Sequence, residues 1–168
     1  MVKPFLLAEC NIEREVLIRM GFSFKHEIEK ADGKSDVIIR SYRNYQNQIA
    51  IGLVDEDPHK NHPREYFEYK KELDRSYQMK FIQRPNSQHY LIEFYGEFEP
   101  WILQMNKFAK IDAGRYKVES IPRRLHEMNQ LRKIPSHYLD FYWKIWEAYP
   151  EPFNKIKEWI DSVKSHNQ

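Results

Sequence analysis

The chain has 168 residues, of which 41% are hydrophobic and 31% charged, with a net charge of +2. This composition is typical of one compact globular domain and excludes disordered and fibrous chains, and it gives no overall basic field of the kind that marks many nucleic-acid-binding domains. No apolar run approaches the roughly 20 residues of a membrane-spanning helix, and Glu9 interrupts the first apolar run too early for a secretory signal. The lone Cys10 excludes an internal disulfide, so we expect a protein of the reducing cytoplasm with no membrane partner.

Strands and helices alternate through the first third of the chain. Strands are indicated by short apolar runs or by alternation of apolar and polar residues, and helices by apolar residues three and four apart. The predicted strands are residues 3–8, 22–29 and 49–54; the predicted helices are residues 11–22 and a segment that begins at Ser35 or Asp36. The run IAIGLV at 49–54 is almost wholly apolar, which favours a central strand covered on both faces.

The rest of the chain contains two more strands and then becomes helical. We predict a helix after Pro63 over residues 63–77, strands over 78–84 and 89–95, a helix over 97–108, and three final helices over 120–134, 136–149 and 152–163. In the first of these three, Ile121, Leu125, Met128 and Leu131 share one predicted face. The order indicates a single α/β domain: a mostly parallel sheet flanked by helices over residues 1–110, and a helical C-terminal layer over residues 111–168.

Carboxylates follow two of the predicted strands. Glu9 ends the first strand, and Asp55 and Asp57 end the run IAIGLV. The carboxyl ends of parallel strands lie at one edge of a sheet, so we expect these three side chains to meet there. Two carboxylates two residues apart repel each other unless a hard cation lies between them. Because carboxylate oxygens suit Mg²⁺ and Mn²⁺, the pattern predicts a metal site, with Glu56 pointing away into solvent.

A glutamate that closes the first strand, followed by an Asp-x-Asp that closes a later hydrophobic strand, resembles the signature of the Toprim domain. That domain occurs in topoisomerases, bacterial primases and nucleases of the overcoming-lysogenization-defect type. The segment FEPW, with Phe98, Glu99 and Trp101, is similar to a stretch after the fourth strand in small stand-alone Toprim-like proteins of bacterial and phage defence loci. The resemblance covers roughly residues 4 to 106. One position departs from it, because Cys10 stands where Toprim domains usually have glycine.

The resemblance implies phosphodiester chemistry on DNA or RNA. In such domains the two aspartates bind Mg²⁺, and the glutamate is a general acid/base or a further metal ligand; Glu99 is a candidate for an additional ligand. No tyrosine is marked out as a topoisomerase nucleophile, and the chain is too short for a primase. The simplest function is therefore that of a metal-dependent nuclease acting in defence against phage, with Glu9, Asp55 and Asp57 as its catalytic residues.

Two other interpretations remain open. Asp-x-Asp after a strand is a weak motif alone, because acids commonly open loops and cap helices. The chain could therefore be a non-catalytic binding or regulatory protein that acts through a partner protein, a second copy of itself or a nucleic acid. A nucleotide-binding phosphoryl-transfer domain is a further alternative, although no glycine-rich phosphate loop supports it.

Basic residues near the acidic cluster are candidates for phosphate contacts. Lys60 and Arg64 follow the aspartates directly, and Arg123 and Arg124 lie off the apolar face of a predicted helix. A solvated helix surface is the simpler interpretation of the two later arginines. His59 and His62 are expected in a surface loop. The aromatic residues of 138–149 recur at helical spacing, which favours a core or a dimer interface over base stacking.

Overall fold

The computed structural model describes residues 5–165, and the structural statements below concern these residues. Six strands form one sheet in the order β2-β1-β3-β6-β5-β4. The strands are β1 (Phe5–Ala8), β2 (Ile28–Lys30), β3 (Ala50–Asp55), β4 (Lys71–Ser76), β5 (Met79–Gln83) and β6 (His89–Phe94). Strands β2, β1, β3 and β6 run parallel to one another, whereas β5 and β4 add an antiparallel edge. The predicted α/β fold class is confirmed.

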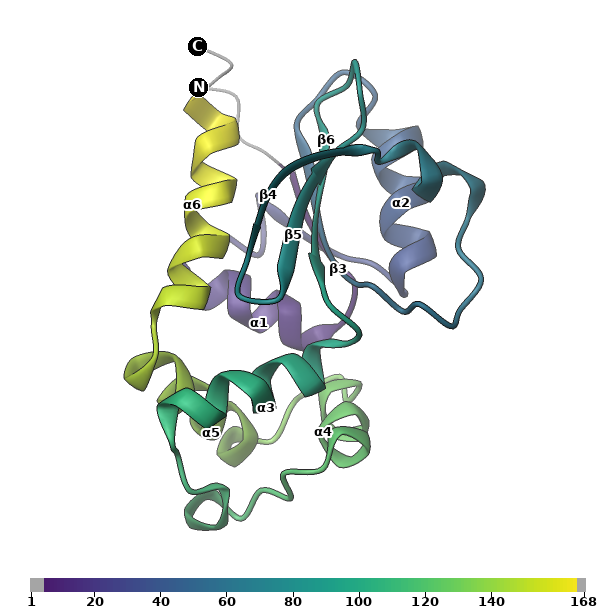
Figure 1. Cartoon of the computed structure of the whole chain (residues 1–168). Coiled ribbons are helices and arrows are strands. Elements are labelled where there is room, and N and C mark those ends of the chain that lie inside the picture. Colours follow the sequence, from purple (N-terminus) through teal and green to yellow (C-terminus); the bar gives the residue numbers. More distant parts are fainter. Residues whose placement is uncertain (1–4, 166–168) are drawn as a thin grey trace.

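Helices cover both faces of the sheet and one of its ends. They are α1 (Asn11–Arg19), α2 (Lys34–Asn44), α3 (Phe98–Ala109), α4 (Pro122–Asn129), α5 (Ser136–Ala148) and α6 (Glu151–Ser165), with short 3-10 helices η1 (Arg64–Glu68) and η2 (Ala113–Tyr116). In Figure 1, α1 and α6 lie on one side of the sheet and α2 on the other, while α3, α4 and α5 gather beyond the carboxyl ends of the central strands. None of the described helices combines the length and apolar character that crossing a bilayer would need.

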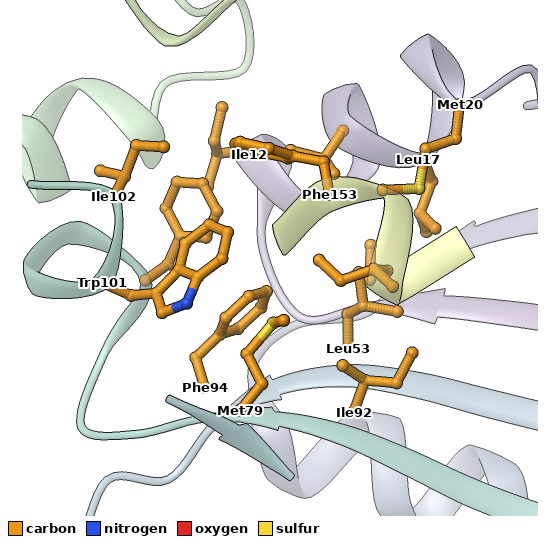
Figure 2. Close-up of a cluster of buried hydrophobic side chains, with 14 of the residues drawn as sticks. Ile12, Leu17, Met20, Leu53, Met79, Ile92, Phe94, Trp101, Ile102 and Phe153 are labelled. Atoms are coloured by element: carbon orange, nitrogen blue, oxygen red, sulfur yellow. The ribbon is translucent and has the colours of Figure 1, made fainter. Parts of the chain in front are cut away.

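Alternate strand residues face two hydrophobic cores. The larger core lies between the sheet and α1, α3, α5 and α6; in Figure 2, Leu53 and Ile92 of the sheet face Leu17 and Phe153 of the helices. The smaller core lies under α2 and contains Leu7 and its neighbours. Because both faces are covered, every residue of β3 is buried, as an almost wholly apolar strand requires. The buried β3 therefore carries its final residue to the end of the sheet where α3 begins.

Two predicted elements are wrong in detail at the sheet edges. The helix predicted over 63–77 is only the 3-10 helix η1, after which β4 pairs antiparallel with β5. The segment KELDRS in β4 is charged because it lies exposed at the edge of the sheet, where charge discourages pairing with another chain. The strand predicted over 22–29 is reduced to Ile28–Lys30, because Glu27 and Ile28 both donate backbone hydrogen bonds to the carbonyl of Ser23 and close a turn.

The apolar face predicted for the first C-terminal helix is also only partly present. Helix α4 ends at Asn129, and of its predicted apolar positions only Leu125 is buried completely. Ile121 and Leu131 lie outside the helix and are 54% and 43% exposed. The helix thus packs through Leu125 and the buried Asn129, and leaves Ile121 and Leu131 at the surface.

A candidate metal centre at the carboxyl ends of the strands

Glu9, Asp55 and Asp57 meet at one edge of the sheet. Glu9 follows β1 directly, Asp55 is the last residue of β3, and these two strands are parallel neighbours. One carboxylate oxygen from each of the three residues lies within 4.8 Å of the other two. The sequence-based prediction that these side chains converge therefore agrees with the structure. We refer to these residues as the carboxylate triad.

Backbone hydrogen bonds hold the triad in place. Glu9 Oε2 accepts a hydrogen bond from the Asp55 amide at 2.7 Å, and Asp55 Oδ1 accepts one from the Phe98 amide at 2.9 Å, in the first turn of α3. Asp57 adopts a left-handed conformation with φ of +47°, and its amide donates to the carbonyl of Gly96 at 3.0 Å. Aspartate tolerates this region better than most residues, so the turn brings Asp57 back toward Asp55.

Two further carboxylates lie behind the triad, and both are buried. Glu99 was a candidate ligand in the sequence; Glu13 was not. Glu13 Oε2 accepts a hydrogen bond from the Cys10 amide at 2.8 Å, whereas Glu13 Oε1 and Glu99 Oε2 are buried without a hydrogen-bond partner. Glu99 is not part of the group within metal-bridging reach. A signal for Glu13 exists in the sequence, because it lies beside Ile12, Val16 and Leu17 on the apolar face of its helix.

The electrostatics of this group favour proton or cation binding. Burial, followed by the charges of Glu13 and Glu9, raises the pKa of Asp55 to about 10. Burial and the charge of Glu9 likewise raise the pKa of Glu13 to about 8, and burial raises the pKa of Glu9. A divalent cation among these oxygens would remove the repulsion that disfavours their ionised forms. The donor set of oxygens only, with unpartnered carboxylate oxygens close by, therefore fits Mg²⁺ or Mn²⁺.

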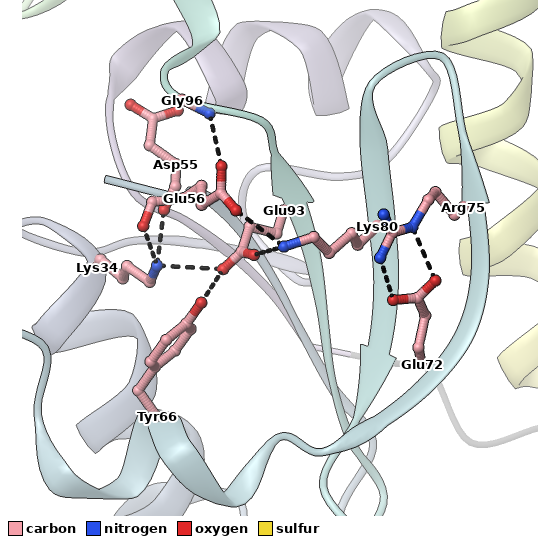
Figure 3. Close-up of polar contacts among 9 residues, drawn as sticks. All are labelled: Lys34, Asp55, Glu56, Tyr66, Glu72, Arg75, Lys80, Glu93 and Gly96. Carbon is pink, nitrogen blue, oxygen red and sulfur yellow. Dashed lines mark hydrogen bonds and ion pairs between the residues drawn. The ribbon is translucent and has the colours of Figure 1, made fainter. Parts of the chain in front are cut away.

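Two lysines lie next to the triad, and one is exposed while the other is buried. Lys60 Nζ is 2.9 Å from Asp57 Oδ1, and its side chain is 64% exposed, so its ammonium remains open to a second anion. Lys34 is buried and donates to the carbonyl oxygens of Asp55 at 2.8 Å and Glu56 at 2.9 Å (Figure 3). Lys34 thus fixes the backbone from which the two aspartates project.

A polar network extends from Lys34 away from the triad. Glu93 of β6 pairs with Lys34 at 3.1 Å and with Lys80 at 3.2 Å, and it accepts a hydrogen bond from Tyr66 (Figure 3). Glu56 points away from the triad as predicted, but the prediction that it is simply solvated is wrong. Its carboxylate pairs with Lys80 at 2.9 Å and accepts a hydrogen bond from the Gly96 amide. The residue between the aspartates therefore anchors the turn from its other side.

A pocket of about 390 Å³ opens over Glu9 and Asp55, two of the three residues of the triad. The C-terminal helical layer contributes to its wall, because His126 of α4 and Gln130 border it. Asn129 donates to Glu99 Oε1 at 2.8 Å, and His126 Nδ1 lies 3.4 Å from the same oxygen. Glu99 raises the pKa of His126 through this contact. Helix α4 therefore borders the site through His126 and Asn129, whereas the sequence pointed only to its arginines Arg123 and Arg124.

Cys10 occupies the position where Toprim domains usually have glycine, and its backbone explains why a side chain fits. Its φ of −135° and ψ of −177° are extended values that any residue adopts, so no glycine is required. The Cys10 side chain is buried at the pocket wall, and burial raises the pKa of its thiol well above the ordinary value. The thiol is therefore protonated and a poor nucleophile at neutral pH.

The basic residues proposed as phosphate contacts occupy different surroundings. Lys60 lines the pocket over the triad, whereas Arg64 is exposed at the start of η1. Arg124 pairs with Glu119 and Glu127, and Arg123 pairs with Glu127, so both guanidinium groups already have anionic partners on the surface of α4. Only Lys60 of these four combines an exposed ammonium with direct contact to the triad.

The two histidines after the aspartates lie in a loop, as predicted. His59 is exposed, and the His62 ring packs 4.5 Å from the ring of Tyr66. Neither belongs to the group within metal-bridging reach. The structure therefore gives no support for a zinc site at these residues.

Comparison with family models, curated proteins and solved structures finds no match to this chain.

Proposed function

We propose that this protein is a cytoplasmic, Toprim-like nuclease that hydrolyses phosphodiester bonds in nucleic acid with Mg²⁺ or Mn²⁺ as cofactor. The observation that carries the proposal is the convergence of Glu9, Asp55 and Asp57 within 4.8 Å at the carboxyl ends of two parallel strands. The parallel order β2-β1-β3-β6 supports it, because it places Glu9 and the aspartates on adjacent strands. The resemblance to defence-associated Toprim-like proteins extends the proposal to defence against phage.

Each residue of the site has its own proposed role. Asp55 and Asp57 would hold the cation, with Glu9 as a third ligand or as the group that carries a proton, since burial raises its pKa. Lys60, exposed beside Asp57, would contact a phosphate oxygen of the substrate. When bound, the metal ion would supply Lewis-acid polarisation of the phosphate and lower the pKa of water in the site.

The second candidate is a non-catalytic binding or regulatory protein that uses the same pocket to hold a metal ion and a phosphate group or a partner. The ion pairs of Arg123 and Arg124 favour this alternative, because both guanidinium groups already have an anionic partner and are less available to a nucleic-acid backbone. The same ion pairs are also compatible with a nuclease that contacts only a few nucleotides.

A cleavage assay separates the two. Plasmid, single-stranded DNA and RNA are each incubated with Mg²⁺ or Mn²⁺ and with the wild type, Asp55→Asn, Glu9→Gln or Glu151→Gln, an exposed control acid at the start of α6. The nuclease proposal expects cleavage by the wild type and the control, and a loss of at least about 100-fold in Asp55→Asn. Cleavage that survives in both site variants would reject it. Metal binding without cleavage would favour the second candidate.

A further inference from the structure

A second hollow, of about 320 Å³, lies beside the carboxylate triad. Its lining comes from the loop after β3, the turn between β6 and α3, and the first turn of α3: Asp57, Pro58, His59, Lys60, Gly96, Glu97 and Pro100. Pro58, Pro100 and Gly96 have no polar side-chain group, so this part of the wall cannot form side-chain hydrogen bonds. We call this hollow the proline slot.

The local backbone keeps the proline slot open. Pro100 is the third residue of α3, where a missing N–H costs nothing because first-turn amides have no partner within the helix. Gly96 has φ of +75°, and no heavy atom lies within 4 Å of the position that its Cβ would occupy. Pro58, His59 and Pro100 are exposed. The slot is therefore an accessible apolar surface next to a strongly polar site.

The slot and the triad share residues. Lys60 lines the proline slot, the pocket over Glu9 and Asp55, and a smaller hollow at the start of α2, while Asp57 lines both the slot and that smaller hollow. A ligand that spans the slot and the triad should be apolar at one end and anionic at the other. A nucleotide has this form, because its base is an aromatic plane and its phosphate would meet Lys60 and the proposed metal ion.

We propose that the proline slot binds an unpaired nucleobase next to the phosphate held at the triad, so that the protein selects single-stranded nucleic acid. This inference rests on the proposed function for the role of the triad. The slot accepts bases of any sequence, because its apolar wall contacts a π-face rather than reading base edges. A base inside a duplex is stacked and paired, and it would first have to leave the helix to enter.

The direct test compares two ligands that differ only in the base. Binding of adenosine 5′-monophosphate and of ribose 5-phosphate is measured by calorimetry with Mg²⁺ present, for the wild type, Pro100→Glu and Pro122→Glu. Pro100→Glu puts a carboxylate at the slot in a helical first turn, where acidic residues are stabilising. Pro122 is an exposed proline in the first turn of α4 and serves as the matched control.

The slot proposal expects adenosine 5′-monophosphate to bind about 10-fold more tightly than ribose 5-phosphate to the wild type and to Pro122→Glu, with this difference abolished in Pro100→Glu. A fluorescent 12-nucleotide single strand should likewise bind better than its duplex to the wild type and to Pro122→Glu, but not to Pro100→Glu. Equal binding of the two small ligands, no binding of either, or a preference that persists in Pro100→Glu would overturn it. Thermal unfolding of each variant confirms that it is folded.

Failure of the slot and failure of the nuclease proposal give different results. If nucleobase binding depends on Pro100 but no cleavage depends on Asp55, the slot proposal stands and the nuclease proposal is rejected. If cleavage depends on Asp55 but adenosine 5′-monophosphate and ribose 5-phosphate bind equally well, the nuclease proposal stands and the slot proposal is rejected. Selective binding of a peptide instead of a nucleotide at the proline slot would also reject the slot proposal.

Discussion

The carboxylate of Glu9 accepts a 2.7 Å hydrogen bond from the backbone amide of Asp55. This bond joins the end of β1 to the last residue of β3, beyond the last pair of their ladder, Ala8 opposite Leu53. The Glu9 carboxylate is therefore held by the scaffold while it lies within reach of Asp55 and Asp57. The same side chain contributes both to the shape of the site and to its charge, and the two contributions can be separated by mutation.

Glu9→Gln should weaken metal binding without destabilising the fold. The amide oxygen of glutamine can still accept from the Asp55 amide, whereas the negative charge is lost. We expect the affinity for Mn²⁺ to fall by at least about 10-fold. The free energy of unfolding without metal should stay equal or rise, because a half-buried charge beside other carboxylates is removed. Glu9→Leu, which also loses the acceptor, should cost about 1–3 kcal/mol. Titration with Mn²⁺ followed by electron paramagnetic resonance, together with urea denaturation, measures both; unchanged Mn²⁺ affinity in Glu9→Gln would contradict the site.

The metal-free protein should become less stable as pH rises from about 5 to 8. Burial raises the pKa of Glu13 from its ordinary value of 4.5 to about 8, so between these values the folded state keeps a proton that the unfolded state has lost. Stability then falls as pH rises, and Asp55, with a pKa of about 10, acts in the same direction. Carboxyls with lowered pKa, such as Asp36, act below this window.

The control for this pH effect is Glu13→Gln, whose amide can still accept from the Cys10 amide. It should reduce the slope of unfolding free energy against pH by up to about 1.4 kcal/mol per pH unit, the effect of one proton. Urea denaturation at several pH values in the presence of a chelator measures the slope. Addition of Mg²⁺ should flatten it in the wild type, because a cation favours the ionised carboxylates. A wild-type slope of the opposite sign would contradict the assigned burial of this group.

Lys34→Met should destabilise the protein and loosen the turn that carries the aspartates. The ammonium donates to the carbonyls of Asp55 and Glu56 and pairs with Glu93, and the side chain is only 5% exposed. Removing it leaves two carbonyls without this donor and Glu93 with fewer partners, which should cost about 3 kcal/mol. Lys144→Met, which removes an exposed pair with Glu147, should change stability by less than about 1 kcal/mol. Equal changes in the free energy of unfolding for the two substitutions would show that the buried network stabilises the fold no more than an exposed ion pair does.

The positions of the triad residues could be predicted because they depend on a rule of sheet topology. An apolar run such as that in β3 indicates a buried parallel strand, and parallel strands present their carboxyl ends at one edge. Glu9 and Asp55 therefore converge whatever the details of the intervening helices. The predicted α/β class rests on the same periodicities, which are strong in the buried strands and helices.

Other parts of the site depend on tertiary contacts that no local pattern shows. Glu13 lies on the apolar face of α1, which is a sign of its burial, but its nearness to Glu9 and Asp55 appears only in the folded structure. The segment KELDRS of β4 has the charge content of a surface helix, yet its pairing with β5 makes it a strand. The contact of His126 with Glu99 joins residues from separate parts of the chain, so it appears only in the folded structure.

Substitution of Lys60 should weaken nucleic-acid binding through phosphate contact alone. If the proposed function holds, Lys60→Met lowers affinity equally for different sequences and reduces the slope of log affinity against log salt by about 1. Arg124→Met is the matched control, because the Arg124 guanidinium already pairs with Glu127 at 2.6 Å. Fluorescence anisotropy with a labelled single strand between 50 and 200 mM salt, a range of about fourfold in which phosphate contacts are well resolved, measures both slopes. A reduced slope in Arg124→Met with no change in Lys60→Met would move the nucleic-acid interface to α4.

Gly52→Ala should destabilise the fold at the centre of the sheet. A Cβ on Gly52 would lie 2.6 Å from Val37 Cγ1 and 2.8 Å from Leu91 Cδ2, both in the core under α2. Val37 is β-branched and stiff in its helix, so α2 would have to move, at a cost of about 1–3 kcal/mol. This exceeds the gain of about 0.5–1 kcal/mol that alanine normally brings over glycine in a strand. Urea denaturation of Gly52→Ala, Val37→Ala and the double variant should give a favourable coupling energy of about 1 kcal/mol, since the shorter side chain makes room for the new Cβ. Additive effects, or a Gly52→Ala protein as stable as the wild type, would show that α2 does not pack against β3 this closely.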